Sequence, residues 1–161
     1  MKKVLYLHGL ETKSGGEKVD FLADKCYIHA PSIDYSRNDI FPLLIKIIKD
    51  YEPDLIIGSS MGGYVAYVLG GLYKIPIIAF NPAIHSRTFS PKFPNFTKKI
   101  TPPNGKIILG KEDTVINPQK TINFLNNPPQ NNTTQLSIEI VEGLGHRIPL
   151  NTFISKIKSE L

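Results

Sequence analysis

The chain has 161 residues, of which 41% are hydrophobic and 20% are charged, and this composition indicates an ordinary globular protein forming one domain over residues 1–161. Its one cysteine, Cys26, excludes an internal disulfide and a cysteine-based metal cluster, and no apolar stretch approaches the roughly 20 residues of a membrane span. The net charge of +5 comes from scattered lysines without a recognisable nucleic-acid motif, so we expect neither nucleic acid nor membrane as a partner.

The first apolar run, residues 4–7, follows two lysines in the manner of a secretory signal. It is far shorter than the roughly 7 to 15 apolar residues that such a signal requires. We therefore interpret the run as a strand and expect a cytoplasmic protein, with which a single cysteine agrees.

From this point, short β-branched runs alternate with segments of helical periodicity. The runs predict strands over residues 3–7, 26–29, 55–57, 76–80, 106–109 and 136–141. The periodic segments predict helices over residues 17–25, 39–51, 61–73, 118–125 and 149–161. This alternation predicts an α/β fold: a three-layer α/β/α sandwich around a mostly or fully parallel six-stranded sheet, with helices on both faces.

One connection, residues 81–105, is about 25 residues long and contains five prolines, so it cannot be one regular helix. It is either a small flap whose Phe89, Phe93 and Phe96 line an acyl pocket, or an irregular excursion whose aromatic rings close the core. We favour the second interpretation because aromatic side chains more often pack. A second break, residues 126–134, is rich in proline and asparagine and predicts a solvent-exposed turn.

The pattern Gly58-x-Ser60-x-Gly62 stands between the predicted strand 55–57 and the predicted helix 61–73. Strand, sharp turn and helix in this order form the nucleophile elbow of α/β hydrolases, where glycines allow the backbone to hold a serine in a strained, exposed turn. Ser60 is at the centre of the pattern, and the sequence predicts it as a nucleophile. Its neighbour Ser59 is interpreted as a turn residue or as a hydrogen-bond donor that supports the site.

A serine hydroxyl is a weak nucleophile, so it needs a base that takes its proton and a carboxylate that orients that base. Asp113 follows the strand 106–109, and His146 follows the strand 136–141. Because the carboxyl ends of parallel strands meet at one edge of a sheet, both should lie near Ser60. Ser60, His146 and Asp113 are therefore the predicted catalytic triad, with the adjoining Glu112 left open as the acid.

Backbone N–H groups should bind the negatively charged oxygen that forms during acyl transfer. One donor is expected from Met61, directly after the nucleophile, and the other from Leu10, in the loop after the first strand. We expect a structural role for His8 in that loop. His29 and His85 lack metal-ligand spacing and are also interpreted as structural, so no metal site is predicted.

Five motifs span almost the whole chain: Leu7-His8-Gly9, Gly58-Ser59-Ser60-Met61-Gly62-Gly63-Tyr64, Asn81-Pro82-Ala83, Gly110-x-x-Asp113 and Val141-Glu142-Gly143-x-x-His146. They resemble those of the small bacterial YqiA-like esterases of the α/β-hydrolase superfamily. The resemblance implies a minimal hydrolase sheet without the first antiparallel strands and without a cap domain. It also implies short or accessible esters as substrates, no cofactor, and the triad named above.

The chain departs from this family in two places beside the predicted base. Ile148 stands where relatives commonly carry an aromatic residue, and Arg147 adjoins the histidine. Arg147 either biases the site towards anionic substrates or faces water, and we favour the second.

These observations predict a serine hydrolase, a carboxylesterase or thioesterase working through an acyl-enzyme on a small-molecule substrate. Two alternatives remain. One is a non-catalytic α/β-hydrolase-like protein that keeps the elbow and binds a ligand. The other is an acyltransferase with the same triad, which differs only in what attacks the acyl-enzyme.

Overall fold

Strands and helices alternate along the described part of the chain, which comprises residues 1–94, 100–126 and 135–161 of a computed structural model. The strands are β1 (Lys3–Leu7), β2 (Tyr27–His29), β3 (Leu55–Ser59), β4 (Ile77–Phe80), β5 (Gly105–Gly110) and β6 (Leu136–Val141). The helices are α1 (Glu17–Ala23), α2 (Ile40–Tyr51), α3 (Met61–Tyr73), α4 (Pro118–Leu125) and α5 (Leu150–Ile157). Every predicted element is present, with ends that shift by a few residues.

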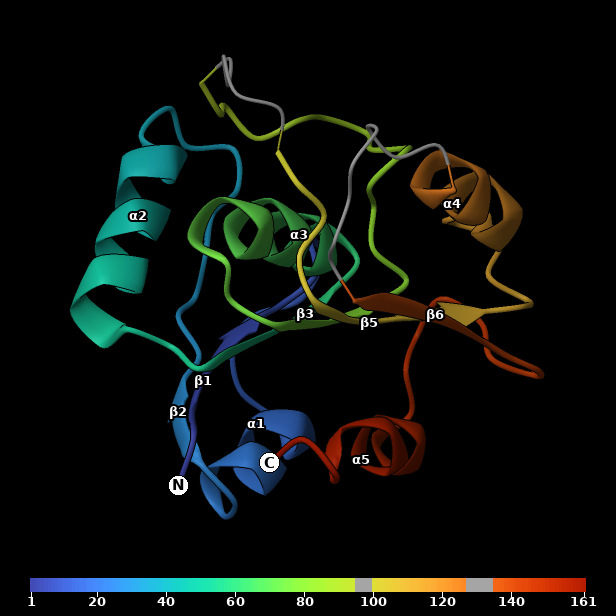
Figure 1. Cartoon of the computed structure of the whole chain (residues 1–161), viewed down its shortest axis with the longest axis horizontal. Coiled ribbons are helices and arrows are strands. Elements are labelled where there is room, and N and C mark those ends of the chain that lie inside the picture. The colour runs from blue at the N-terminus through green and yellow to red at the C-terminus, as the bar shows by residue number, and fades with distance from the viewer. Residues whose placement is uncertain (95–99, 127–134) are drawn as a thin grey trace.

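The strands form one sheet in the order β2-β1-β3-β4-β5-β6, and every neighbouring pair is parallel. Helices α2, α3 and α4 cover one face of this sheet, and α1 and α5 cover the other (Figure 1). The predicted three-layer α/β/α sandwich is thus confirmed, with a fully parallel sheet and no cap domain among the described residues. No helix in these parts of the chain is both long and apolar enough to cross a membrane.

Helix α2 carries an apolar stripe that faces the sheet. In α2 the side chains of Ile40, Leu44 and Ile48, spaced four residues apart, are buried on one side of the helix. Pro42 lies in the first turn of α2, where a backbone N–H has no acceptor within the helix, so the proline does not break it. The sequence period therefore fixes which side of the helix meets the strands.

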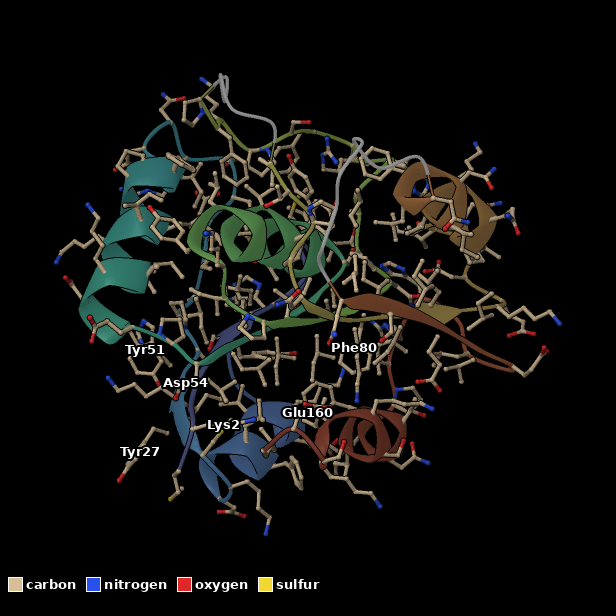
Figure 2. The ribbon with its side chains drawn as sticks, in the orientation of Figure 1. Lys2, Tyr27, Tyr51, Asp54, Phe80 and Glu160 are labelled. Carbon is tan, nitrogen blue, oxygen red and sulfur yellow. The ribbon has the colours of Figure 1, made fainter. Side chains whose placement is uncertain are left out.

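Two separate hydrophobic cores fill the two sides of the sheet. One joins the sheet to α2 and α3, and includes Leu44, Ile56 and Val65. The other joins it to α1 and α5, where the Phe153 ring lies 6.1 Å from the Tyr6 ring and 5.3 Å from the Phe80 ring. Figure 2 shows Phe80 on the side of the sheet that faces α5. Each fully buried side chain of this size contributes about 1.5–3 kcal/mol to stability.

Strand register determines which loops lie side by side. Leu7 pairs with Gly58, Ser59 with Phe80, Phe80 with Ile108, and Gly110 with Val141. The segments that follow β1, β3, β4, β5 and β6 therefore leave the sheet along one edge. This is the edge at which open α/β sheets form their binding sites.

Candidate active site

Ser60 occupies a sharp turn between β3 and α3, with φ of 54° and ψ of −114°. Such a positive φ is unfavourable for a residue with a side chain and is held in place only by the surrounding structure. Glycine makes the turn possible, because a Cβ at Gly62 would lie 2.1 Å from the Leu7 carbonyl oxygen and one at Gly58 would lie 2.3 Å from the Gly62 oxygen. The turn thus has the backbone geometry of the predicted elbow.

The Ser60 hydroxyl lies next to the imidazole of His146, which comes from the loop between β6 and α5. The distance from Ser60 Oγ to His146 Nε2 is 3.1 Å. On the other side of the ring, His146 Nδ1 lies 2.8 Å from Asp113 Oδ2. An ionised carboxylate only accepts hydrogen bonds, so the proton sits on Nδ1 and Nε2 is free to accept the serine proton.

Asp113 is fixed from several directions. Its side chain is 0% exposed, and its second oxygen, Oδ1, accepts the backbone N–H groups of Val115 at 2.8 Å and Ile116 at 2.9 Å. The neighbouring Glu112 side chain is exposed, and its backbone N–H donates to the Leu144 carbonyl at 3.0 Å. Of the two carboxylates left open by the sequence, Asp113 is the one hydrogen-bonded to His146.

The two predicted oxyanion donors come from Met61, the residue after Ser60, and from Leu10, whose neighbour Gly9 lies close to Ser60. Met61 opens α3, and the first N–H groups of a helix have no acceptor within it. Leu10 lies in the loop after β1, where a Cβ built on the preceding Gly9 would be 3.6 Å from Ser60 Cβ. The backbones of Met61 and Gly9 therefore lie next to Ser60, and the role of the Met61 and Leu10 N–H groups as oxyanion donors stays a prediction.

His8 holds the loop that carries Leu10. Its Nε2 accepts the Ile33 N–H at 2.9 Å, so its Nδ1 carries the proton and donates to the Gly9 carbonyl at 2.7 Å. The His8 carbonyl accepts the hydroxyl of Tyr35 at 2.6 Å. Burial raises the pKa of that hydroxyl well above its usual range, so it stays a donor.

The remaining histidines lie apart from the triad. The His29 ring contacts the Tyr51 ring at 5.3 Å, and His85 Nδ1 lies 3.0 Å from Thr121 Oγ1. Burial, followed by the charges of Lys120 and Arg87, lowers the pKa of His85. Within residues 1–94, 100–126 and 135–161, no three histidine, cysteine or acidic side chains gather in a way that could hold a metal ion.

The segment after β4 crosses over α3 between α4 and α2 (Figure 1). The Phe93 ring packs between Phe41, at 5.4 Å, and Tyr64, at 6.0 Å, and Phe89 packs against the same core. The Arg87 guanidinium lies 3.9 Å above the Tyr64 ring. Phe89 and Phe93 thus extend the core. Phe96 and residues 127–134 of the predicted turn 126–134 lie outside the described residues.

One residue of this region received no role from the sequence. Asn81 follows β4 directly, is buried, and binds backbone atoms of both the Asp113 and the His146 loops. The available signal was its position, because Asn81-Pro82 leaves the sheet at the same edge as the triad. Tyr35 was missed as well, since nothing in its sequence neighbourhood points to the His8 carbonyl.

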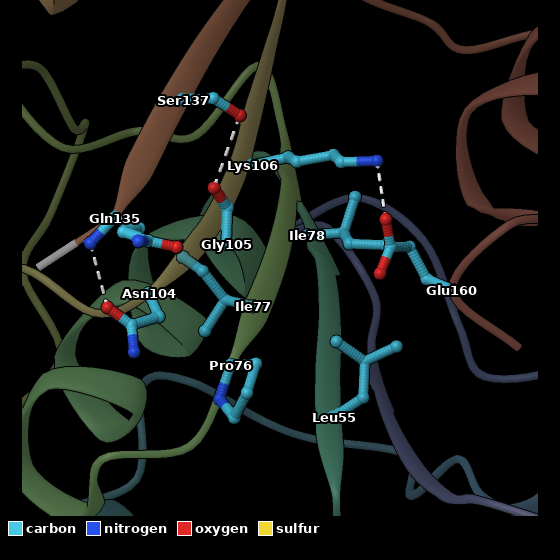
Figure 3. A pocket seen from close by; sticks show the side chains of 10 residues that line it. All are labelled: Leu55, Pro76, Ile77, Ile78, Asn104, Gly105, Lys106, Gln135, Ser137 and Glu160. Atoms are coloured by element: carbon cyan, nitrogen blue, oxygen red, sulfur yellow. Dashed lines mark hydrogen bonds and ion pairs between the residues drawn. The ribbon is translucent and has the colours of Figure 1, made fainter.

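A small pocket of about 220 Å³ lies at the opposite edge of the sheet, where β3, β4, β5 and β6 begin (Figure 3). Its polar groups bind one another: Lys106 pairs with Glu160, and Asn104 Oδ1 accepts the Gln135 N–H. The triad and this pocket are therefore on different ends of the molecule.

Residues 3–101 match the family described as "Uncharacterised protein family (UPF0227)". The fold is similar to that of a monoacylglycerol lipase from Paleococcus ferrophilus, with a TM-score of 0.72 and 14% identity over 98% of this chain and 91% of that one. It is also similar to MGS-MChE2, an alpha/beta hydrolase enzyme from a lagoon-sediment metagenome, with a TM-score of 0.69 and 15% identity over 99% and 90% of the two chains. A third similar structure is Est1E from Butyrivibrio proteoclasticus, with a TM-score of 0.69 and 12% identity over 98% and 84%.

Proposed function

Because this chain belongs to the UPF0227 family and has an α/β-hydrolase fold, we propose that it is a serine hydrolase that cleaves carboxylic esters or thioesters. The membership agrees with the YqiA-like motifs of the sequence. The observation that carries the proposal is the unbroken set of contacts from Ser60 Oγ through both nitrogens of His146 to Asp113 Oδ2. The lipase and hydrolase names of the similar structures support the same class of reaction.

In the first half of the reaction, Ser60 Oγ attacks the acyl carbon while its proton passes to His146 Nε2. The electron pair of the carbonyl double bond moves to the carbonyl oxygen, which the N–H groups of Met61 and Leu10 stabilise. Asp113 holds the Nδ1 proton and stabilises the positive ring. The tetrahedral species then expels the alcohol or thiol, which takes the proton from Nε2, and an acyl group remains on Ser60.

In the second half, a water molecule attacks the acyl-enzyme and gives one proton to His146 Nε2. The oxyanion forms again at the same N–H groups. Its collapse breaks the bond to Ser60 Oγ, which recovers the proton from Nε2, and the free acid leaves. No metal or redox cofactor takes part in these steps.

The test is turnover of 4-nitrophenyl acetate by the wild type and by Ser60→Ala, His146→Ala and Ser59→Ala. Removal of Ser60 or His146 should lower kcat by roughly 10⁴–10⁶. The matched control Ser59→Ala makes the same substitution at the preceding serine and should retain most activity. Full activity in Ser60→Ala, or no turnover by folded wild-type protein across short esters and thioesters, would contradict the proposal.

A further inference from the structure

Asn81 is a buried polar residue in an unusual backbone conformation. It is 1% exposed, and its φ of 42° lies in the left-handed region that few residues with side chains adopt. A buried amide is costly unless its groups are hydrogen-bonded. Its partners therefore indicate why this residue type stands directly after β4.

Each side of the Asn81 amide meets a different loop. The nitrogen Nδ2 donates to the carbonyl oxygens of Gly145 at 2.9 Å and His146 at 3.1 Å. The oxygen Oδ1 accepts the backbone N–H of Gly110 at 2.7 Å. Two carbonyls face the nitrogen and one N–H faces the oxygen, so the orientation of the amide is fixed by its surroundings.

These partners belong to the two loops that carry the acid and the base. Gly110 ends β5, and its carbonyl accepts the Asp113 N–H at 3.2 Å. The loops are also in direct contact, since a Cβ at Gly110 would lie 2.3 Å from the Leu144 carbonyl oxygen. The backbone beyond Asn81 reaches the nucleophile, because Ala83 N–H donates to the Ser60 carbonyl at 3.0 Å.

We propose that Asn81 is a positioning residue, which holds the His146 imidazole at hydrogen-bonding distance from both Ser60 and Asp113. This inference rests on the proposed hydrolase function. Asn81 touches no reacting atom and acts through the backbone at Gly110, Gly145 and His146. Its contribution to the rate is large because a misplacement of about 1 Å in a catalytic group can cost 10²-fold.

Asparagine suits this position for chemical reasons. Aspartate has the same shape, but its carboxylate would face two carbonyl oxygens without a proton to donate. Glycine fits the positive φ and leaves room for water, yet supplies no link between the loops. The variants Asn81→Asp and Asn81→Gly therefore remove the donors in two ways, one electrostatic and one by deletion.

The experiment compares both variants with the wild type in three measurements: melting temperature, kcat and KM for 4-nitrophenyl acetate, and the downfield proton resonance of the His146–Asp113 hydrogen bond. Two controls accompany them. Asn104→Asp makes the same chemical change at the opposite edge of the sheet. Phe153→Leu lowers stability by changing the core between the sheet and the helices α1 and α5. We expect kcat to fall by about 10²-fold with KM within about threefold, together with a shifted or lost resonance, in the Asn81 variants alone.

Wild-type kcat and an unchanged resonance in folded Asn81→Gly would overturn the proposal, whether or not Asn81→Asp folds. The variants are also compared at temperatures equally far below their own melting temperatures. If the Asn81 variants then lose no more kcat than Phe153→Leu, the proposal is overturned as well, because Asn81 would serve stability alone. The resonance does not depend on turnover. If the wild type hydrolyses no ester while the resonance still responds to Asn81, the hydrolase function fails and the positioning role stands.

Discussion

Asp113 and Glu112 are neighbours in the sequence, but their side chains lie in different environments. The Asp113 carboxylate is shielded from water and accepts hydrogen bonds from Val115, Ile116 and His146. The Glu112 side chain points to solvent. A carboxylate can stabilise a protonated imidazole well only where water does not screen the charge, so the two residues should contribute very differently to catalysis.

We therefore expect Asp113→Asn to lower kcat by about 10⁴, because an amide at this place favours the wrong histidine tautomer. Glu112→Gln, a matched change one residue earlier, should stay within about twofold, as for an ordinary surface substitution. Steady-state kinetics on both folded variants checks this. Comparable losses in the two would mean that the acid is not Asp113 alone.

The order of residues along the chain predicts Ser60, His146 and Asp113 as a triad, with Glu112 open as the acid, because their chemistry is in their side chains and each follows a strand. The fold brings the three side chains within hydrogen-bonding distance of one another, and their catalytic roles stay predictions. Asn81 and Tyr35 could not be found in this way. Their partners are backbone carbonyl and N–H groups of distant loops, and every residue carries such groups. Only the fold brings them together.

At the level of elements, the backbones of β3, α3 and β1 approach so closely that no side chain fits at Gly58 or Gly62. Gly62 lies in the first turn of α3, and its Cα faces the backbone of Leu7 and His8. A Cβ built on Gly63, the next residue, would lie 3.0 Å from the Cβ of Pro82. This proximity brings the loop after β1, which carries Leu10, close to the turn that carries Ser60.

Alanine ordinarily stabilises a helix interior over glycine by about 1 kcal/mol. In Gly62→Ala we expect the opposite, a loss of about 1–3 kcal/mol or more, because the new Cβ would lie 2.1 Å from the Leu7 carbonyl oxygen. Urea unfolding measures the difference. Gly9→Ala, whose nearest contacts would be ordinary ones of 3.5 and 3.6 Å, should be much less affected, and a stabilised Gly62→Ala would show that the elbow is looser than described.

The bounds of the elements show the limits of the sequence pattern. The predicted strand 55–57 is longer in the structure, where β3 extends through Ser59. The sequence did not predict this extension because Gly58 and Ser59 do not continue the apolar run. The predicted helix 149–161 ends as α5 at Ile157, after which the Glu160 N–H donates to the Ile157 carbonyl in a turn. Helix ends depend on such local bonds rather than on periodicity.

The segment after β4 provides another test at this scale. The Phe93 ring packs between Phe41 and Tyr64, so Phe93→Ala should cost about 1–3 kcal/mol of stability, part of the 3–5 kcal/mol of a fully buried ring. The preference among acetyl, butyryl and octanoyl 4-nitrophenyl esters should not change. A changed chain-length preference without loss of stability would instead make this segment the acyl-pocket flap.

At the scale of the whole molecule, the predicted triad and the small pocket lie at opposite ends of the parallel strands. The triad lies where the strands end, while the Lys106–Glu160 pair and the small pocket of Figure 3 lie where they begin. Two cores, one on each face, hold the sheet between them. We propose that they form a single folding unit, because every strand of the sheet contributes to the same three-layer stack.

Thermal unfolding should then be one cooperative transition. The calorimetric enthalpy should equal the van't Hoff enthalpy, and circular dichroism and tyrosine fluorescence should give coincident curves. Two resolved transitions would indicate that the two sides of the sheet unfold independently.

If Ser60 is an activated nucleophile, it should react with a fluorophosphonate, and intact-mass analysis after incubation detects the product. Attack by Ser60 Oγ on phosphorus expels fluoride and leaves a stable phosphonyl ester on the serine. We expect one adduct on the wild type and on Ser59→Ala, mapped to Ser60, and none on Ser60→Ala. An unlabelled wild type that is demonstrably folded, or equal labelling of Ser60→Ala, would contradict it.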